Sequence, residues 1–228
     1  HVDGAYGGSA ALLPEMRWIT EGWDRADSIV VNPHKWLFVP VDLSALYCKR
    51  MDVLRRAFSL VPEYLRTSDP DEVKNFMDYG PQLGRRFRAL KFWFVLRYFG
   101  VEGLTARIRE HIQLAKEFAA WVDASSDWER MAPAPFSTVC FRANPYKGAA
   151  EPPDFTRAES ELGKLNERIM EAVNREGKVF LSHTKLNGRM TLRLAIGNIR
   201  TTREHVMLAR EQLGAALASL LSDYSSDT

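Results

Sequence analysis

The stretch ADSIVVNPHKW, residues 26–36, decides how the first part of this 228-residue chain folds. Its β-branched run predicts a buried strand from Ala26 to Val31, and the strand leads directly into Asn32-Pro33-His34-Lys35-Trp36. A lysine beside a histidine at a strand end stands where a side chain can carry out chemistry. We expect apolar surroundings for Lys35, because desolvation favours the neutral, nucleophilic amine.

The first eight residues, HVDGAYGG, complete this pattern. His1-Val2-Asp3 is typical of the end of a strand, and the small residues that follow allow a tight loop and close approach of backbone or ligand. An amine for a Schiff base and a carboxylate for a pyridinium nitrogen are what a protein supplies to pyridoxal 5'-phosphate (PLP). Lys35 and Asp3 together therefore predict a PLP site, although Asp3 alone also fits the role of a turn or cap residue.

The composition excludes several other classes of protein. The chain is 46% apolar and 26% charged with a net charge of +2, which gives no reason to expect nucleic acid or a membrane surface as partner. No apolar stretch approaches the roughly 18–20 residues of a membrane span. Cys48 and Cys140 are too few and too far apart for a disulfide framework or a metal site. We expect no bound metal and a reducing, cytoplasmic setting.

The remaining pattern predicts an α/β fold in two domains, residues 1–100 and 101–228, with the boundary near Gly100. The second domain is expected to be a small α+β unit in which Asn187-Gly188 forms a hairpin turn and Thr201 or Thr202 caps the last helix. Strands are predicted at 42–48, 136–142, 179–181 and 189–196. Helices are predicted at 51–58, 86–99, 104–122, 159–175 and from the cap to 221.

Two segments of the first domain stand out. The helix at 86–99 is apolar on nearly all sides, which predicts that it is buried. Residues 59–82 contain three prolines, many charges and no clear period. A loop of this length within a compact domain is usually functional or mobile, and we expect a mobile loop here.

Four motifs together resemble one known family: HVDGAYGG (1–8), ADSIVVNPHKW (26–36), LGRRFRALKFWFVLRYFGVEGL (83–104) and LRLAIGN (192–198). They are similar to the PLP-dependent group II amino acid decarboxylases, and within that group to the aromatic-L-amino-acid decarboxylases. The resemblance implies the type I fold of PLP enzymes, here the C-terminal part of the large α/β domain plus the small C-terminal domain. It also implies a homodimer with the active site at the subunit interface.

The same resemblance implies a carboxy-lyase of amino acid and carboxylic acid metabolism. Its substrate would be an L-amino acid, aromatic by the closest similarity (DOPA, tyrosine, tryptophan or phenylalanine), converted to the amine and CO2. Glutamate or histidine decarboxylation and aromatic aldehyde synthesis remain alternatives within the family. An inactive fragment that acts only as a structural or dimerisation partner is the alternative outside it.

The resemblance also implies roles for five residues around the cofactor. Lys35 forms the Schiff base, and Asp3 hydrogen-bonds the pyridine nitrogen, which keeps the ring an electron sink. Ala5 packs against the ring face. Asn32 and His34 lie near the cofactor phosphate and Lys35, and His34 is also a candidate catalytic residue.

Further candidates lie outside this cluster. Tyr64, within Pro62-Glu63-Tyr64-Leu65, corresponds to a loop tyrosine that protonates the substrate carbon after CO2 leaves; related aldehyde synthases typically have phenylalanine there. Leu83 and Gly84 belong to a segment that resembles the one that reaches the neighbouring subunit's active site in family members. Arg193 corresponds to an arginine close to the substrate carboxylate, although a structural role fits it equally well. The histidines at 111, 183 and 205 are expected on surfaces, without a function.

The chain has no initiator methionine and begins within a predicted strand. By the resemblance, the phosphate-binding loop and a histidine that stacks on the PLP ring precede His1. We therefore expect a C-terminal portion of a longer protein, unable to hold PLP tightly or turn over substrate alone.

Overall fold

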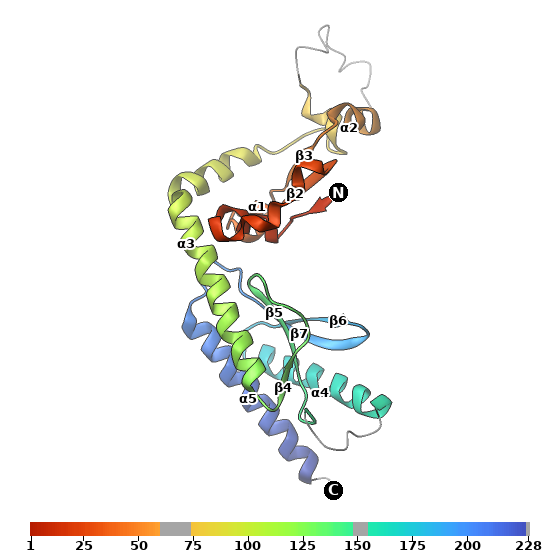
Figure 1. The fold of residues 1–228 in the computed structure, drawn as a ribbon, viewed down its shortest axis with the longest axis vertical. Helices are drawn as coiled ribbons and strands as arrows, with labels where there is room; N and C mark the ends of the chain where they lie inside the picture. The colour runs from red at the N-terminus through yellow and green to blue at the C-terminus, as the bar shows by residue number, and fades with distance from the viewer. Residues whose placement is uncertain (60–73, 148–154, 227–228) are drawn as a thin grey trace. The chain divides into compact units, whose positions relative to one another are not determined.

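The computed structural model describes residues 1–59, 74–147 and 155–226 (Figure 1). The chain divides into two compact units, His1–Thr105 and Ala106–Thr228, called here the first and second unit. Helix α3 (Arg88–Ala124) runs through the division, and Gly100 is its non-helical residue, with φ 63° and ψ −178°.

The first unit contains a three-stranded sheet with the order β1-β2-β3. Strand β1 (Val2–Asp3) runs parallel to β2 (Ser28–Val31), and β3 (Ala45–Cys48) runs antiparallel to β2. Both predicted strands, at 26–31 and 42–48, are confirmed, with later starts, although β2 is half-buried rather than buried as predicted. Three short 3-10 helices connect β1 to β2: η1 (Gly7–Leu12), η2 (Pro14–Thr20) and η3 (Trp23–Arg25).

Short helices follow β2 and β3. Helix α1 (Pro33–Trp36) comes directly after β2, and α2 (Met51–Phe58) has the predicted bounds. A 3-10 turn, η5 (Phe76–Tyr79), precedes α3. The core of this unit collects apolar side chains around α1, and its members include Ala10, Leu13, Trp36, Leu37, Val39 and Leu43.

Polar contacts attach the loop between α1 and β3 to the start of α3. The Arg88 guanidinium donates to one carboxylate oxygen of Asp42 at 2.9 and 3.1 Å, and Lys91 Nζ donates to the Pro40 carbonyl at 2.7 Å. The hydrogen bond from Arg88 holds the pKa of Asp42 below its usual value. Because ion pairs this close to water stabilise little, their main effect is to fix the path of the loop.

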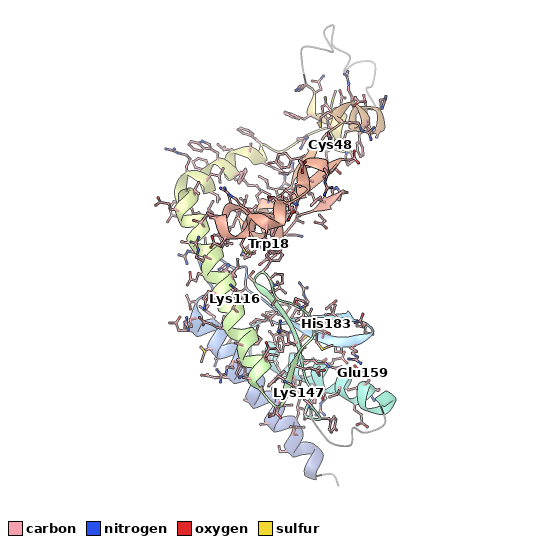
Figure 2. The ribbon with its side chains drawn as sticks, in the orientation of Figure 1. Trp18, Cys48, Lys116, Lys147, Glu159 and His183 are labelled. Atoms are coloured by element: carbon pink, nitrogen blue, oxygen red, sulfur yellow. The ribbon has the colours of Figure 1, made fainter. Side chains whose placement is uncertain are left out.

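The start of α3 differs from its prediction. The helix begins at Arg88, and its apolar side chains Trp93, Phe94 and Tyr98 are 54%, 58% and 81% exposed. The predicted burial is therefore wrong for the residues that the structure describes. An all-round apolar helix needs cover on every side, and the described residues cover these side chains only in part. Trp18, labelled in Figure 2, is also 57% exposed.

The second unit is an α+β structure built on an antiparallel sheet with the order β4-β5-β7-β6. Its strands are β4 (Trp128–Arg130), β5 (Thr138–Ala143), β6 (Ser182–Leu186) and β7 (Arg189–Ala195). Helices α4 (Phe155–Arg175) and α5 (Arg203–Ser226) share one apolar core with the sheet and with the later turns of α3. Fully buried members of that core include Val122, Phe141, Ile169, Leu192 and Leu213.

The hairpin between β6 and β7 forms as predicted. Asn187 and Gly188 both have positive φ, 51° and 78°, as a two-residue type I′ turn requires. The predicted strand at 179–181 is wrong, because β6 starts at Ser182. The side chain of Asn174 instead forms hydrogen bonds with the backbone N–H and C=O of Leu181, at 2.7 and 2.9 Å. These two backbone groups therefore do not pair with a neighbouring strand.

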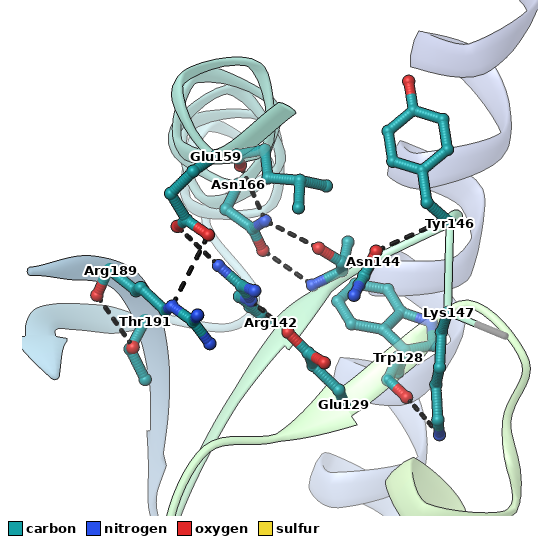
Figure 3. A network of polar contacts seen from close by, with 12 residues as sticks. Trp128, Glu129, Arg142, Asn144, Tyr146, Lys147, Glu159, Asn166, Arg189 and Thr191 are labelled. Atoms are coloured by element: carbon teal, nitrogen blue, oxygen red, sulfur yellow. Dashed lines mark hydrogen bonds and ion pairs between the residues drawn. The ribbon is translucent and has the colours of Figure 1, made fainter. Parts of the chain in front are cut away.

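A polar network ties α4 to the sheet of the second unit (Figure 3). Arg142 on β5 is 4% exposed and donates to Glu129 and, at 2.6 Å, to Glu159. The fully buried Asn166 bonds both backbone groups of Ala143, at 2.7 and 2.9 Å. Burial acts to lower the pKa of Arg142, but the bonds to Glu159 and Glu129 outweigh it and raise the pKa.

His111 on α3 corrects another expectation, since it is fully buried rather than on a surface. Its pKa falls to about 4, mainly because burial disfavours the charged ring. His183 and His205 are exposed as predicted. Helix α5 begins directly after Thr202, whose hydroxyl contacts the side chains of Glu204 and His205.

Across the described ranges, no helix is both long and apolar enough to cross a membrane.

Candidate functional site

Two neighbouring parallel strands bring the predicted cofactor residues to one edge of the first sheet. Asp3 ends β1 and pairs in register with Val30 of β2, so both strands end at the same level. The carboxyl ends of adjacent parallel strands are where open α/β sheets bind ligands. The segments that follow these ends carry Ala5 on one side and Asn32, His34 and Lys35 on the other.

The loop after β1 is fitted closely against β2. The backbone N–H of Asn32 donates to the carbonyl of Ala5 at 3.0 Å. A Cβ on Gly4 would lie 3.0 Å from the Val30 carbonyl oxygen, and one on Gly8 would lie 2.9 Å from Val31 Cγ2. Larger residues at these two positions would push the loop away from the strand.

Asp3 combines both roles that the sequence allows. Its Oδ1 accepts a hydrogen bond from the backbone N–H of Ala5 at 2.9 Å, which is the bond of an aspartate-led turn. The side chain remains exposed at the sheet edge. The turn bond therefore fixes the direction of the carboxylate, and a carboxylate has a second oxygen that can accept from a ligand.

Lys35 lies on α1, and its backbone N–H donates to the Asn32 carbonyl at 2.9 Å. Pro33 and Trp36 on either side turn inward and are buried, whereas the Lys35 side chain is exposed. The apolar surroundings expected for the amine are therefore not provided by the described residues.

His34 and Asn32 differ in how they are held. Nδ1 of His34 lies 2.6 Å from the carbonyl oxygen and 3.0 Å from the backbone nitrogen of Leu43. The ring is thus tied to the loop before β3 through Nδ1, and Nε2 is the nitrogen through which it can act on a ligand. Oδ1 of Asn32 is a buried acceptor without a hydrogen-bond partner among the described residues. Such an atom marks a place where a donor is missing.

These residues fit the groups that PLP requires. The sheet edge offers an exposed amine on Lys35, an oriented carboxylate on Asp3 and an unsatisfied buried acceptor on Asn32. An amine and a carboxylate are the two groups that attach PLP and hold its pyridine nitrogen. Among the described residues, no group of three His, Cys, Asp or Glu side chains is arranged to hold a metal ion.

The roles of all the predicted site residues stay predictions, and four candidates belong to other segments. Tyr64 lies outside the described residues. Leu83 and Gly84 lie between η5 and α3 in the first unit and are exposed. Arg193 lies on β7 in the second unit, opposite Cys140 and Ser182.

Sequence reasoning missed one contact at this site. The rings of Tyr6 and Trp36 stack with centroids 4.6 Å apart and an interplanar angle of 5°. The available signal was position, because each aromatic residue directly follows a predicted site residue, Ala5 or Lys35.

A family model described as the pyridoxal-dependent decarboxylase conserved domain matches residues 1–144. The chain belongs to this family. A tryptophan decarboxylase of Camptotheca acuminata is 42% identical over 225 residues, which are 96% of this chain and 44% of the relative. A phenylacetaldehyde synthase of Arabidopsis thaliana is 42% identical over 208 residues, 90% of this chain and 41% of the relative.

Solved structures agree with the family assignment. The crystal structure of Oryza sativa TDC with PLP and tryptamine matches with a TM-score of 0.86 at 37% identity, covering 96% of this chain and 44% of that one. Rhodiola rosea 4-hydroxyphenylacetaldehyde synthase matches with a TM-score of 0.80 at 32% identity, covering 96% and 43%. The predicted α/β type I fold of PLP enzymes is thereby confirmed. The chain spans less than half the length of these relatives.

Proposed function

We propose that the protein containing this chain is a PLP-dependent carboxy-lyase that converts an aromatic L-amino acid to its amine and CO2. The observation that carries the proposal is the parallel pairing of β1 and β2, with Asp3 and Lys35 at the same sheet edge. Relatives named tryptophan, tyrosine and aromatic-L-amino-acid decarboxylases support an aromatic substrate. Because the chain spans under half of these relatives, the activity is proposed for the whole protein.

Each residue at the edge has a part in this reaction. Lys35 supplies the amine that attaches the cofactor, and Asp3 accepts a hydrogen bond from the pyridine N–H and so keeps that nitrogen protonated. When bound, PLP supplies the electron sink for the charge that remains when CO2 leaves. By the family resemblance Ala5 would pack against the ring face, and Asn32 Oδ1, which has no hydrogen-bond partner among the described residues, could accept a hydrogen bond from the bound cofactor.

Two residues are proposed to handle protons. His34 is held by contacts of its Nδ1 with the backbone of Leu43. Its Nε2 takes no part in those contacts and is proposed to exchange a proton with substrate. By the family resemblance, Tyr64 donates a proton to the substrate carbon that has lost its carboxylate.

Aldehyde synthesis is the second candidate, because a phenylacetaldehyde synthase is as similar to this chain as a tryptophan decarboxylase is. Overall identity therefore does not separate the two reactions. The oxidative reaction consumes O2 and water and releases CO2, ammonia and hydrogen peroxide with the aldehyde. Tyrosine at position 64 favours the decarboxylase, by the resemblance to a family in which aldehyde synthases typically carry phenylalanine.

The homodimer and the cytoplasmic location remain proposals. The exposed apolar side chains at the start of α3 support an additional protein surface over this helix, because contiguous apolar patches usually mark interfaces. Light scattering of the full-length protein tests the dimer, and cell fractionation tests the location.

The decisive experiment uses the full-length protein with PLP and separate solutions of tryptophan, tyrosine, DOPA, phenylalanine, glutamate and histidine. Amine, aldehyde and hydrogen peroxide are quantified for each. We expect amine from an aromatic substrate and none from Lys35→Ala. Lys49→Ala, which removes an exposed lysine just after β3, is the matched control and should retain activity.

Three outcomes would contradict the proposal. Amine release by Lys35→Ala at the wild-type rate would remove Lys35 from the chemistry. Aldehyde with stoichiometric hydrogen peroxide would favour the second candidate. No product from any amino acid, with no PLP bound, would favour a protein with a purely structural role.

A further inference from the structure

The stacked rings of Tyr6 and Trp36 connect the two segments that carry the proposed cofactor ligands. Tyr6 belongs to the loop that begins at Asp3, and Trp36 belongs to the helix that carries Lys35. Their rings are nearly parallel, at 5°, with centroids 4.6 Å apart. The side chains adjacent to the ligands are thus in direct contact across the sheet edge.

Helix α1 cannot set its own orientation. It has four residues, and a single turn is far below the length at which a helix is stable by itself. It is followed by Phe38 with a positive φ of 60°, a conformation that an aromatic residue adopts only when its surroundings impose it. Contacts with other segments must therefore hold α1 in place.

The contacts that do so are hydrogen bonds near the start of α1 and a ring stack, called here the brace, at its end. On the side facing β1, the backbone bond from Asn32 to Ala5 at 3.0 Å fixes the start of α1 at one point. On the other side, Nδ1 of His34 lies 2.6 Å from the carbonyl oxygen and 3.0 Å from the backbone nitrogen of Leu43. These contacts also act near the start of α1, so the end of the helix that carries Lys35 and Trp36 can still tilt. A parallel stack of two rings, one of them the fully buried Trp36, resists that tilt, because any tilt opens the rings on one side.

We propose that Tyr6 and Trp36 form a positioning pair that sets the direction of the Lys35 amine relative to the Asp3 carboxylate. The proposal rests on the proposed function, since PLP is the rigid group that both ligands would engage at once. A rigid ligand that two protein groups hold at once binds best when those two groups are already oriented before binding. The pair acts through Lys35 and Asp3 and has no contact with the reacting atoms in this role.

The variants separate the ring stack from the tyrosine hydroxyl. Tyr6→Leu removes the stack, whereas Tyr6→Phe keeps the ring and removes only the hydroxyl. Tyr47→Leu removes an exposed tyrosine from β3 in the same unit and serves as the matched control. Trp36→Phe, which keeps an aromatic ring in the buried position, provides a second, milder test from the other side of the stack.

The first measurement is PLP binding to the full-length protein, by absorbance titration and by visible circular dichroism of the bound cofactor. For Tyr6→Leu we expect the dissociation constant to rise about tenfold. The dichroism for each bound cofactor should also fall, because it reports how rigidly the ring is held. Tyr6→Phe and Tyr47→Leu should match the wild type. Wild-type binding and dichroism in Tyr6→Leu would overturn the proposal, and so would equal losses in Tyr6→Phe and Tyr6→Leu.

The second measurement needs no cofactor. Hydrogen–deuterium exchange of residues 32–39 in the PLP-free protein should be faster in Tyr6→Leu than in Tyr6→Phe, because α1 has lost its brace. Unchanged exchange would overturn the positioning pair even in a protein that binds PLP. Faster exchange in a protein that binds no PLP would instead support the brace and contradict the proposed function.

Discussion

Replacing His111 by glutamine is expected to remove a sensitivity to acid from the second unit. His111 is fully buried on α3, and its pKa is lowered to about 4. Burial is the main cause, the positive charge of Arg107 adds to it, and a hydrogen bond with the backbone of Asn198 opposes both. The folded unit therefore holds this ring neutral at a pH where a free histidine already binds a proton.

The sign and size of the effect follow from the two pKa values. Above the ordinary value of 6.5 the ring is neutral in both the folded and the unfolded chain, so pH has no effect through it. Between 6.5 and about 4 only the unfolded chain binds the proton, so the free energy of unfolding falls as the pH falls. At about 1.36 kcal/mol per pH unit, the loss between pH 7 and pH 5 comes to about 2 kcal/mol.

The assay compares wild type with His111→Gln at pH 7 and pH 5, a range in which most carboxylates stay charged. The urea dependence of hydrogen–deuterium exchange in peptides of β5 and β7, corrected for the intrinsic rate at each pH, gives the free energy of opening for this unit alone. His183→Gln is the matched control, because this exposed ring meets water whether the chain is folded or not.

Wild type and His183→Gln should lose about 2 kcal/mol more than His111→Gln on going from pH 7 to pH 5. A lower stability of the glutamine variant at both pH values does not affect this comparison, which uses only the difference in free energy between pH 7 and pH 5. Equal losses in wild type and His111→Gln would refute the reasoning, because they would show that the buried ring takes up its proton as readily as a free one.

Three further predictions concern the second unit, each measured by urea unfolding. Arg142→Met should cost about 2–3 kcal/mol, because Glu129 and Glu159 keep their charges without the cation between them; Arg142→Lys should recover part of it. Asn166→Ala should cost about 3 kcal/mol by leaving buried backbone groups unpaired, and a loss under about 1 kcal/mol would mean that water replaces the amide. Gly188→Ala should cost about 1 kcal/mol through its φ of 78° alone, because a Cβ there meets no atom within 4 Å.

Local patterns predicted the parts of the fold that local forces determine. The β-branched run at 28–31 forms β2, the helix at 51–58 has its predicted bounds, and Asn187-Gly188 turns the hairpin. In each case the sequence pattern and the interactions that form the element involve residues only a few positions apart. Asp3 and Lys35 were paired from the sequence by the chemistry that PLP requires, and their roles stay predictions; the parallel register of β1 and β2, which places both residues at one sheet edge, was not part of that reasoning.

Features that depend on distant partners were not predictable in the same way. His111 has the sequence surroundings of an amphipathic helix, and only the packing of the second unit decides that it is buried. Val179-Phe180-Leu181 has a strand composition, but the amide of Asn174 takes the backbone groups of Leu181. The stack of Tyr6 on Trp36 joins residues thirty positions apart, and their positions beside Ala5 and Lys35 place both rings near the site without indicating that they touch.

The exposure of the candidate site sets a condition on how it can work. Lys35 and Asp3 are both exposed at the sheet edge, and the aromatic side chains at the start of α3 are exposed as well. Loss of CO2 from an amino acid builds up charge that water would protonate at random, so a decarboxylase must exclude water around the reacting carbon. The described residues orient an amine and a carboxylate but do not enclose them. If the proposed reaction takes place at this edge, protein surface other than the described residues has to complete the enclosure, and PLP binding by the full-length protein is the measurement that tests this.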